Sequence, residues 1–247
     1  MGPIEITCPT FGRLRLIGDR LHDGHDFVVR SNSKNNVVDY FIFLDSRGIS
    51  HEFDNSLADK LISRITDLNK TYLLVCRPLE LTIWVTLISL LTHTQLNPSK
   101  IITNMGFVDF TPKKLSILQS ALVQIESVLG KGVAESYFVE DFVSSRGGTS
   151  LFSMRFKETY RDAIEAITAR HQIVIINTPL TDPGIKIQRM RPRSFFSAQI
   201  ESNMFNRSIS SAHVIELPDF DEALTYDAVY YTCSGNDLIF DKVKEYL

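Results

Sequence analysis

The sequence predicts an α/β protein in which a mostly parallel sheet is covered by helices on both faces. Three features lead to this expectation. From residue 40 onward, short apolar runs alternate with segments of helical periodicity. The apolar runs are nearly continuous, as in strands that are buried on both faces. The helical segments between them can serve as the crossover connections that parallel strands require.

The predicted strands share a short apolar run that ends in turn residues. In chain order they are "YFIFLDS" (40–46), "TYLLVC" (71–76), "KIITNMGFVDF" (100–110), "QIVIINTPLTDPG" (172–184) and "HVIEL" (213–217).

The predicted helices share apolar residues at helical spacing. They are "NSLADKLISRITDL" (55–68), "LTIWVTLISLL" (81–91), "TPKKLSILQSALVQIESVLG" (111–130), "FKETYRDAIEAITARH" (156–171) and "SGNDLIFDKVKEYL" (234–247). For the third of these we predict Thr111 as the N-cap, Pro112 at the first helical position and Gly130 as the stop. The last helix is expected to begin at Ser234.

Three regions depart from this alternation. Residues 1–39 are predicted to form a strand-rich N-terminal extension to a main domain over residues 40–247, joined by the polar linker "SNSKNN". Residues 140–153 are predicted to be irregular, and the glycine-rich loop "SSRGGTS" (144–150) within them could act as a lid. Residues 181–211 form a long insertion before the last strand, where α/β proteins often build a binding surface.

Composition limits the classes of function. A formal charge of −3 gives no electrostatic case for binding nucleic acid or an anionic membrane. The three widely spaced cysteines suggest neither a disulfide framework nor a zinc site, and fit a reducing compartment. The longest apolar stretch is too short to span a membrane, and the N-terminus lacks a secretory pattern. We expect a cytoplasmic protein without a cofactor, and the sequence leaves its oligomeric state open.

Four stretches of the chain resemble the ordered blocks of the SGNH (GDSL) hydrolase superfamily. They are "FIFLDSRGIS" (41–50), "TYLLVCRPLELTIW" (71–84), "PSKIITNMGFVDF" (98–110) and "YDAVYYTCSGNDLIFDKVKEYL" (226–247). The resemblance covers residues 40–247. It implies a flavodoxin-like three-layer α/β/α fold and a relationship to esterases, lipases and acyl-carbohydrate hydrolases.

Residue by residue, the resemblance places the nucleophile at Ser46 and the triad aspartate at Asp227. The general base falls on Tyr230, which is not a histidine. The oxyanion-hole glycine falls near Glu80, and the asparagine of the third block falls on Val108. The resemblance therefore retains two functional positions and loses three.

These losses matter chemically. A serine hydroxyl needs a base to remove its proton, and a tyrosine with its ordinary pKa of about 10 is protonated at pH 7. Loss of one oxyanion-hole donor costs roughly two to three orders of magnitude in turnover. His51 and His213 are the two histidines that could replace the base, and the sequence does not select either.

Further residues are candidates for ligand contact because they follow predicted strands or lie in the long insertion. They are Asp45, Arg47, Glu80, Gly106, Asp109, Arg191 and Arg193. The segment "KIQRMRPRSFF" (186–196) is either a solvated loop or a clamp for a phosphate or carboxylate. "HDGHD" (22–26) lacks the spacing of a tight metal site and is interpreted as a polar turn, so no metal is expected.

The sequence leaves three functions open. The first is a degenerate SGNH-like protein that binds a small ligand, anionic or carbohydrate, without Ser-His-Asp ester hydrolysis. The second is an active esterase or acyltransferase on acylated carbohydrate-like esters, with Ser46 as the nucleophile. The third is group transfer on an anionic sugar, with carboxylates from Asp45, Glu80 and Asp109.

Overall fold

The computed structural model describes most of the 247-residue chain. The described residues are 4–8, 12–16, 28–33, 37–49, 55–76, 82–93, 96–137, 141–146, 149–153, 158–181, 193–219 and 222–247. Their elements, in chain order, are β1 (Ile4–Cys8), β2 (Gly12–Leu16), β3 (Val28–Ser31), β4 (Val37–Leu44), the short 3-10 helix η1 (Ser46–Gly48), α1 (Leu57–Asp67), β5 (Tyr72–Cys76), α2 (Ile83–His93), β6 (Asn97–Thr103), α3 (Phe107–Phe110), α4 (Leu115–Leu129), α5 (Lys131–Tyr137), β7 (Asp141–Arg146), β8 (Thr149–Ser153), α6 (Glu158–Thr168), β9 (Gln172–Ile176), α7 (Arg193–Ser208), β10 (Ala212–Ile215), α8 (Cys233–Val243) and η2 (Lys244–Tyr246).

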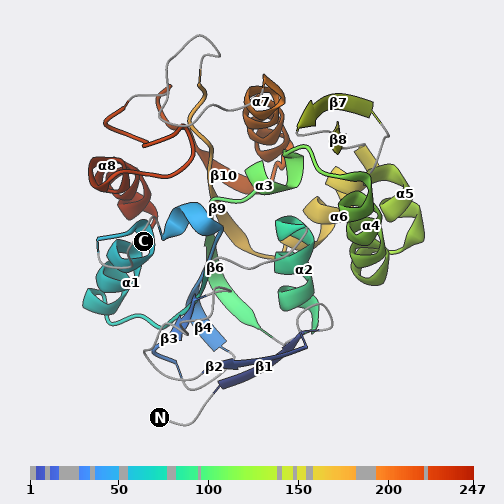
Figure 1. The fold of residues 1–247 in the computed structure, drawn as a ribbon. Helices are drawn as coiled ribbons and strands as arrows, with labels where there is room; N and C mark the ends of the chain where they lie inside the picture. Colours follow the sequence, from blue (N-terminus) through green and yellow to red (C-terminus); the bar gives the residue numbers. More distant parts are fainter. Residues whose placement is uncertain are drawn as a thin grey trace.

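A six-stranded sheet with the order β10-β9-β6-β4-β5-β3 forms the centre of the molecule (Figure 1). Neighbouring strands pair in parallel, except that the edge strand β3 runs antiparallel to β5. Numbered along the chain, the parallel strands have the order 2-1-3-4-5, which is the order of the flavodoxin-like fold. The predicted fold class is therefore confirmed, and the order of the strands reverses between β4 and β6.

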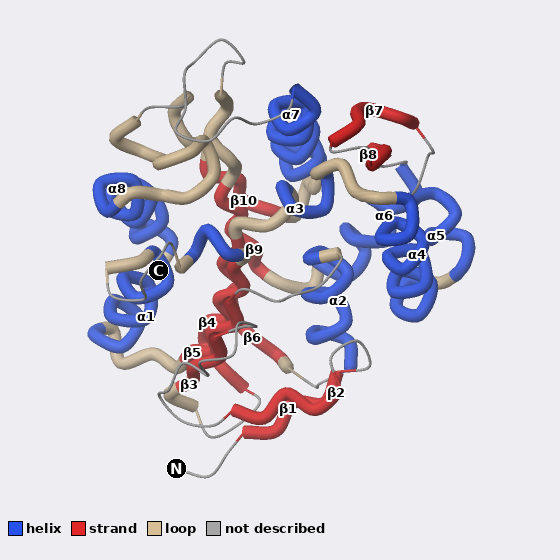
Figure 2. Tube along the Cα trace, viewed as in Figure 1, coloured by secondary structure: helices blue, strands red, loops and turns tan. Residues whose placement is uncertain are grey.

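Helices cover both faces of the sheet, because strand side chains alternate between two apolar cores. Phe41 and Phe43 of β4 point into the core that contains α2, α4, α6 and α7. Ile42 and Leu44 point into the other core, which contains α1 and α8. Figure 2 shows α1 and α8 on one side of the sheet and the remaining helices on the other. These four side chains of β4 are fully buried, so this part of the strand lies at the centre of the fold.

The expected N-terminal extension is divided between two sheets. β1 and β2 pair with each other as an antiparallel hairpin in a separate two-stranded sheet. β3 instead forms the edge of the main sheet, and β4 begins at Val37. The division into an extension over 1–39 and a domain over 40–247 stays a prediction, although residues 28–31 contribute to the main sheet.

Two expected helix starts are wrong. α4 begins at Leu115 rather than after Thr111, because the backbone of Lys113 exchanges two hydrogen bonds with Phe152 of β8. α8 begins at Cys233, one residue before the expected Ser234. Its N-cap is Thr232, whose hydroxyl accepts the N–H of Gly235 at 2.9 Å.

The two irregular regions also contain regular structure. Within residues 140–153, β7 and β8 form an antiparallel hairpin that pairs from Asp141↔Ser153 to Arg146↔Thr149. Within residues 181–211, the helix α7 occupies Arg193–Ser208. The prediction missed α7 because much of its buried face consists of amides and a hydroxyl rather than apolar groups: Gln199, Ser202, Asn203 and Asn206.

Candidate functional site

The carboxyl ends of β4 and β6 mark the position where the strand order reverses. In open α/β sheets, ligands bind outside the carboxyl ends of the strands at this position. Ser46 begins η1 and is the second residue after β4, and Asn104 directly follows β6. The η1 turn lies tightly against β4, since a Cβ on Gly48 would lie 2.6 Å from the Leu44 side chain. The fold therefore brings Ser46 to the edge at which a binding site is expected.

A buried ion pair between Asp45 and Arg47 holds the η1 turn. The Arg47 Nε lies 3.0 Å and 2.9 Å from the two carboxylate oxygens of Asp45. The Nη2 of Arg47 lies 2.7 Å from Asp45 Oδ2. The backbone N–H of Arg47 also donates to Asp45 Oδ1 at 2.9 Å. Only 2% of Asp45 and 1% of Arg47 is exposed. Burial by itself lowers the pKa of Arg47, but the adjacent Asp45 carboxylate raises it above its usual value, so the guanidinium is charged.

Arg47 joins the ends of three parallel strands. Its guanidinium donates to the carbonyl oxygen of Asn104 after β6 and to the hydroxyl of Thr178 after β9. The guanidinium carbon also lies 5.4 Å from the ring centroid of Phe107. These contacts surround a fully buried group, so the hydrogen bonds of the Arg47 guanidinium are made within the protein.

Asn104 completes this network from the neighbouring strand. Its side-chain oxygen accepts the N–H of Asp45 at 2.8 Å, and its amide nitrogen donates to Asp45 Oδ1 at 3.1 Å. The sequence interpretation did not single out Asn104 or Thr178. A polar residue directly after each apolar strand, as in Asp45, Asn104 and Asn177, was the signal that could have identified this network.

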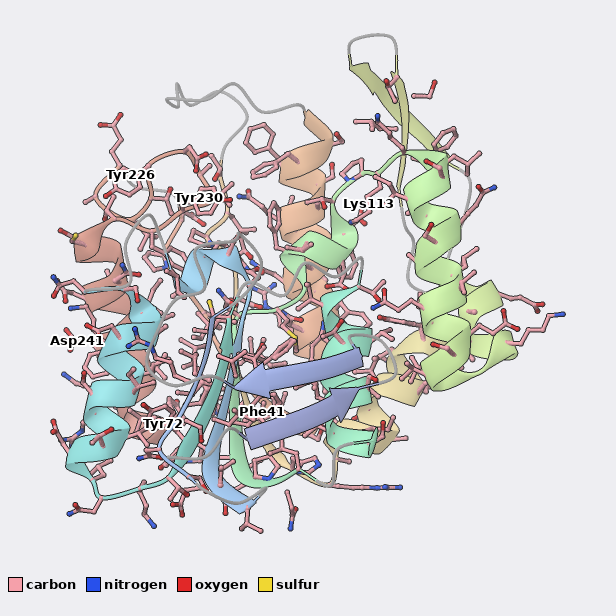
Figure 3. The ribbon with its side chains drawn as sticks, turned by 60° about the horizontal axis from the view of Figure 1, so that its bottom comes forward. Phe41, Tyr72, Lys113, Tyr226, Tyr230 and Asp241 are labelled. Carbon is pink, nitrogen blue, oxygen red and sulfur yellow. The ribbon has the colours of Figure 1, made fainter. Side chains whose placement is uncertain are left out.

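The structure brings together the three positions that the resemblance assigned to the triad. The Ser46 hydroxyl donates to the Tyr230 phenol oxygen across 3.5 Å, a long and weak contact. Both side chains are half-buried. Asp227 Oδ1 accepts the backbone N–H groups of Val229 at 3.2 Å and Tyr230 at 3.1 Å. Figure 3 shows Tyr230 on the loop that precedes α8. Asp227 therefore supports the backbone that carries Tyr230.

Three of the six histidines are among the described residues, and all three lie away from Ser46. His171 precedes β9 and His93 ends α2, so both lie toward the amino edge of the parallel strands. His213 is on β10, three strand positions from β4, which corresponds to about 14 Å at a strand spacing of about 4.8 Å. Its ring lies 4.2 Å from that of Tyr246. His51 lies outside the described residues.

Asp109 lies on α3, in the helical layer beside the sheet. It is fully buried, and its Oδ1 accepts the N–H of Trp84 in the first turn of α2 at 3.4 Å. Burial raises the pKa of Asp109 to about 7, although the charge on Lys113 acts in the opposite direction. Burial likewise lowers the pKa of Lys113, to about 8. The position of Asp109 at the start of α2 gives it a role in capping that helix.

Gly106 has a conformational role. Its φ is +114°, and a Cβ at this position would lie 3.0 Å from Asn206 Oδ1. Val108, which stands where the resemblance expects an asparagine, accepts a hydrogen bond from Lys113 Nζ at 2.5 Å through its carbonyl oxygen.

Of the remaining candidates, Glu80 and Arg191 lie outside the described residues, as does "HDGHD" (22–26). Arg193 is the first residue of α7.

Within the described ranges, no group of three or more His, Cys, Asp or Glu side chains could hold a metal ion. Over the same part of the chain, no helix is both long and apolar enough to cross a membrane.

No family model matches the chain, and no curated protein matches it. Two solved structures are similar to it. One is an active-site mutant of a family two carbohydrate esterase from Clostridium thermocellum in complex with celluohexase, with 11% identity and a TM-score of 0.41. That similarity covers 84% of this chain and 62% of the esterase chain. The other is Est1E from Butyrivibrio proteoclasticus, with 10% identity and a TM-score of 0.41, covering 100% of this chain and 97% of the other.

At this level of similarity neither structure carries an argument about activity. The assignment of the flavodoxin-like fold rests on the strand order of the chain itself.

Proposed function

We propose that this protein binds a small, neutral, hydroxyl-rich ligand at the carboxyl edge of the sheet, and that it does so without Ser-His-Asp ester hydrolysis. The observation that carries the proposal is the partner of Ser46. Where an esterase would place an imidazole, the phenol of Tyr230 lies 3.5 Å from the serine hydroxyl. A phenol does not supply the imidazole that removes the serine proton in such a pair, so this contact supports hydrogen bonding rather than activation of the serine.

Two other features support a binding role over hydrolysis. The carboxylate of Asp227 accepts hydrogen bonds from two backbone N–H groups, and these contacts stabilise the loop. The amide nitrogen of Asn104 donates to Asp45 and is thereby engaged within the protein, rather than directed at a reacting oxygen.

Among the described residues, the charges at this edge favour a neutral ligand over an anionic one. Asp45 and Arg47 neutralise each other in a buried ion pair. The Ser46 and Tyr230 side chains, which are half-buried, carry hydroxyl groups that form hydrogen bonds without net charge. A carbohydrate-like molecule has the complementary groups.

A labelling experiment separates binding from hydrolysis. The purified protein would be treated with a fluorophosphonate probe, alongside the Ser46→Ala variant and a Ser210→Ala control at an exposed site. We expect no labelling of any form under conditions that fully modify a known serine esterase. Labelling of wild type and Ser210→Ala that disappears in Ser46→Ala would refute the proposal and establish the alternative, an active esterase or acyltransferase.

Binding itself would be measured by calorimetry with a panel of neutral oligosaccharides that includes cello-oligosaccharides. For a ligand that binds, we expect Ser46→Ala and Tyr230→Phe each to weaken the affinity about tenfold, the effect of losing a hydrogen bond of about 1.4 kcal/mol. An affinity that neither substitution changes would place the ligand elsewhere on the protein.

A further inference from the structure

The loop that carries Tyr230, residues 225–231, is held in one conformation by its own contacts. The N–H of Tyr226 donates to the carbonyl of Tyr230 at 2.9 Å, and Thr225 and Tyr231 form an isolated antiparallel bridge. Asp227 accepts two N–H groups of the same loop. The loop thus closes on itself and directs Tyr230 toward η1.

Ala228 at the centre of this loop has an unfavourable backbone conformation. Its φ is +66°, in the left-handed region that a non-glycine residue rarely adopts, and the residue is fully buried. Such a conformation costs free energy and persists only when surrounding contacts fix it. Contacts with the rest of the protein therefore add to the loop's own hydrogen bonds in holding this conformation.

Gln199 of α7 supplies such a contact. Its Nε2 donates to the carbonyl of Ala228 at 3.1 Å and to the hydroxyl of Thr181 at 3.3 Å. Its Oε1 accepts the N–H of Thr181 at 3.1 Å. The side chain is completely buried, so water does not compete for these hydrogen bonds. Gln199 therefore ties the Tyr230 loop to the segment that follows β9.

The same face of α7 anchors that segment a second time. Asn203, one turn along the helix, donates to the carbonyl of Thr178 at 2.7 Å and accepts its N–H at 2.9 Å. The Thr178 hydroxyl in turn accepts from Arg47 in η1. Both sides of the contact between Ser46 and Tyr230 are thereby connected by hydrogen bonds to one segment, residues 178–181.

Resting on the proposed role of Ser46 and Tyr230 as the ligand-facing pair, we propose that Gln199 is a positioning residue, which holds Tyr230 opposite Ser46 through the carbonyl of Ala228. The amide must reach two partners on different loops at once. This explains why a long polar side chain stands on a buried helix face where an apolar residue would otherwise be expected.

The test follows the Tyr230 ring by NMR in protein with 13C-labelled tyrosine, with the signal assigned through Tyr230→Phe. In the wild type, Ser46→Ala should displace the Tyr230 signal because it removes the contacting hydroxyl. In a Gln199→Glu background, which loses the donor to Ala228, we expect that displacement to disappear. The matched control is Asn206→Asp, which makes the same amide-to-acid change on the same buried face but contacts Met105 and Asn177.

A merely structural role would lower the melting temperature of both acid variants and leave the coupling between Ser46 and Tyr230 intact. Coupling that survives in Gln199→Glu, or is lost equally in Asn206→Asp, would overturn the proposal. If Gln199→Glu does not fold, Gln199→Met removes the amide without adding charge and decides the question in the same way. No ligand enters this measurement, so its outcome is independent of whether the proposed function fails.

Discussion

Substituting Arg47 with methionine should strongly destabilise the protein. The substitution keeps a long apolar stem but removes the guanidinium, which leaves the Asp45 carboxylate, 2% exposed, without its charged partner. The carbonyl of Asn104 and the hydroxyl of Thr178 lose a donor at the same time. Breaking a buried ion pair by removing one partner costs about 3–5 kcal/mol. For a chain of this size that corresponds to a fall in melting temperature of roughly 6–20 °C.

Denaturant unfolding followed by circular dichroism would measure this cost. The matched control is Arg207→Met, since Arg207 forms a comparable pair with Glu216 at 2.6 Å, but with both side chains about half exposed. We expect the control to lose no more than about 1 kcal/mol, because water already screens the exposed pair.

The double variant Asp45→Asn/Arg47→Met tests the cause of the cost. If the penalty comes from a buried unpaired charge, removing both charges should be less destabilising than the two single substitutions added together, by about 1.5 kcal/mol or more. Strict additivity, or a cost below about 1 kcal/mol for Arg47→Met, would refute the assignment of Arg47 to an internal network.

Two further predictions concern other buried positions. The pKa of Asp109 is raised by burial, so the folded state binds more protons than the unfolded state between about pH 4 and pH 7. The contribution of Asp109 to the free energy of unfolding therefore falls as the pH rises from about 4 to about 7. The difference in unfolding free energy between wild type and Asp109→Asn should therefore change steadily over that range, and a constant difference would contradict the raised pKa. Gly235→Ala should prevent stable folding or shift α8, since a Cβ there would lie 2.0 Å from the carbonyl oxygen of Leu224. An unchanged melting temperature of Gly235→Ala would show that α8 does not approach the Leu224 backbone this closely.

The strands and the position of Ser46 could be predicted from the sequence because local patterns determine them. The run from Phe41 to Leu44 is apolar throughout, since both faces of β4 are buried, and a polar turn follows it at once. The order of these runs and helices restricts the topology to few alternatives. The nucleophile position of the resembling family then fell on Ser46, the second residue after the central strand β4.

The contacts that organise the site could not be predicted in this way, because they join residues far apart in the chain. Arg47 meets the hydroxyl of Thr178 across 131 residues of sequence. Gln199 looks like a surface residue by its chemistry, yet it is completely buried because its partners are backbone groups of two loops. No periodicity of apolar residues reveals a helix face whose burial is satisfied by amides.

The Arg47 prediction also bears on which ligands the carboxyl edge can accept. Asp45, Arg47 and Asn104 lie where the strand order reverses, and they form hydrogen bonds with one another. An anionic ligand could use Arg47 only by separating it from Asp45, at the cost measured for Arg47→Met. A large cost therefore excludes Arg47 as an anion-binding residue and favours a neutral partner for the hydroxyls of Ser46 and Tyr230. A negligible cost would make the guanidinium available, and an anionic ligand at this edge would then become the better hypothesis.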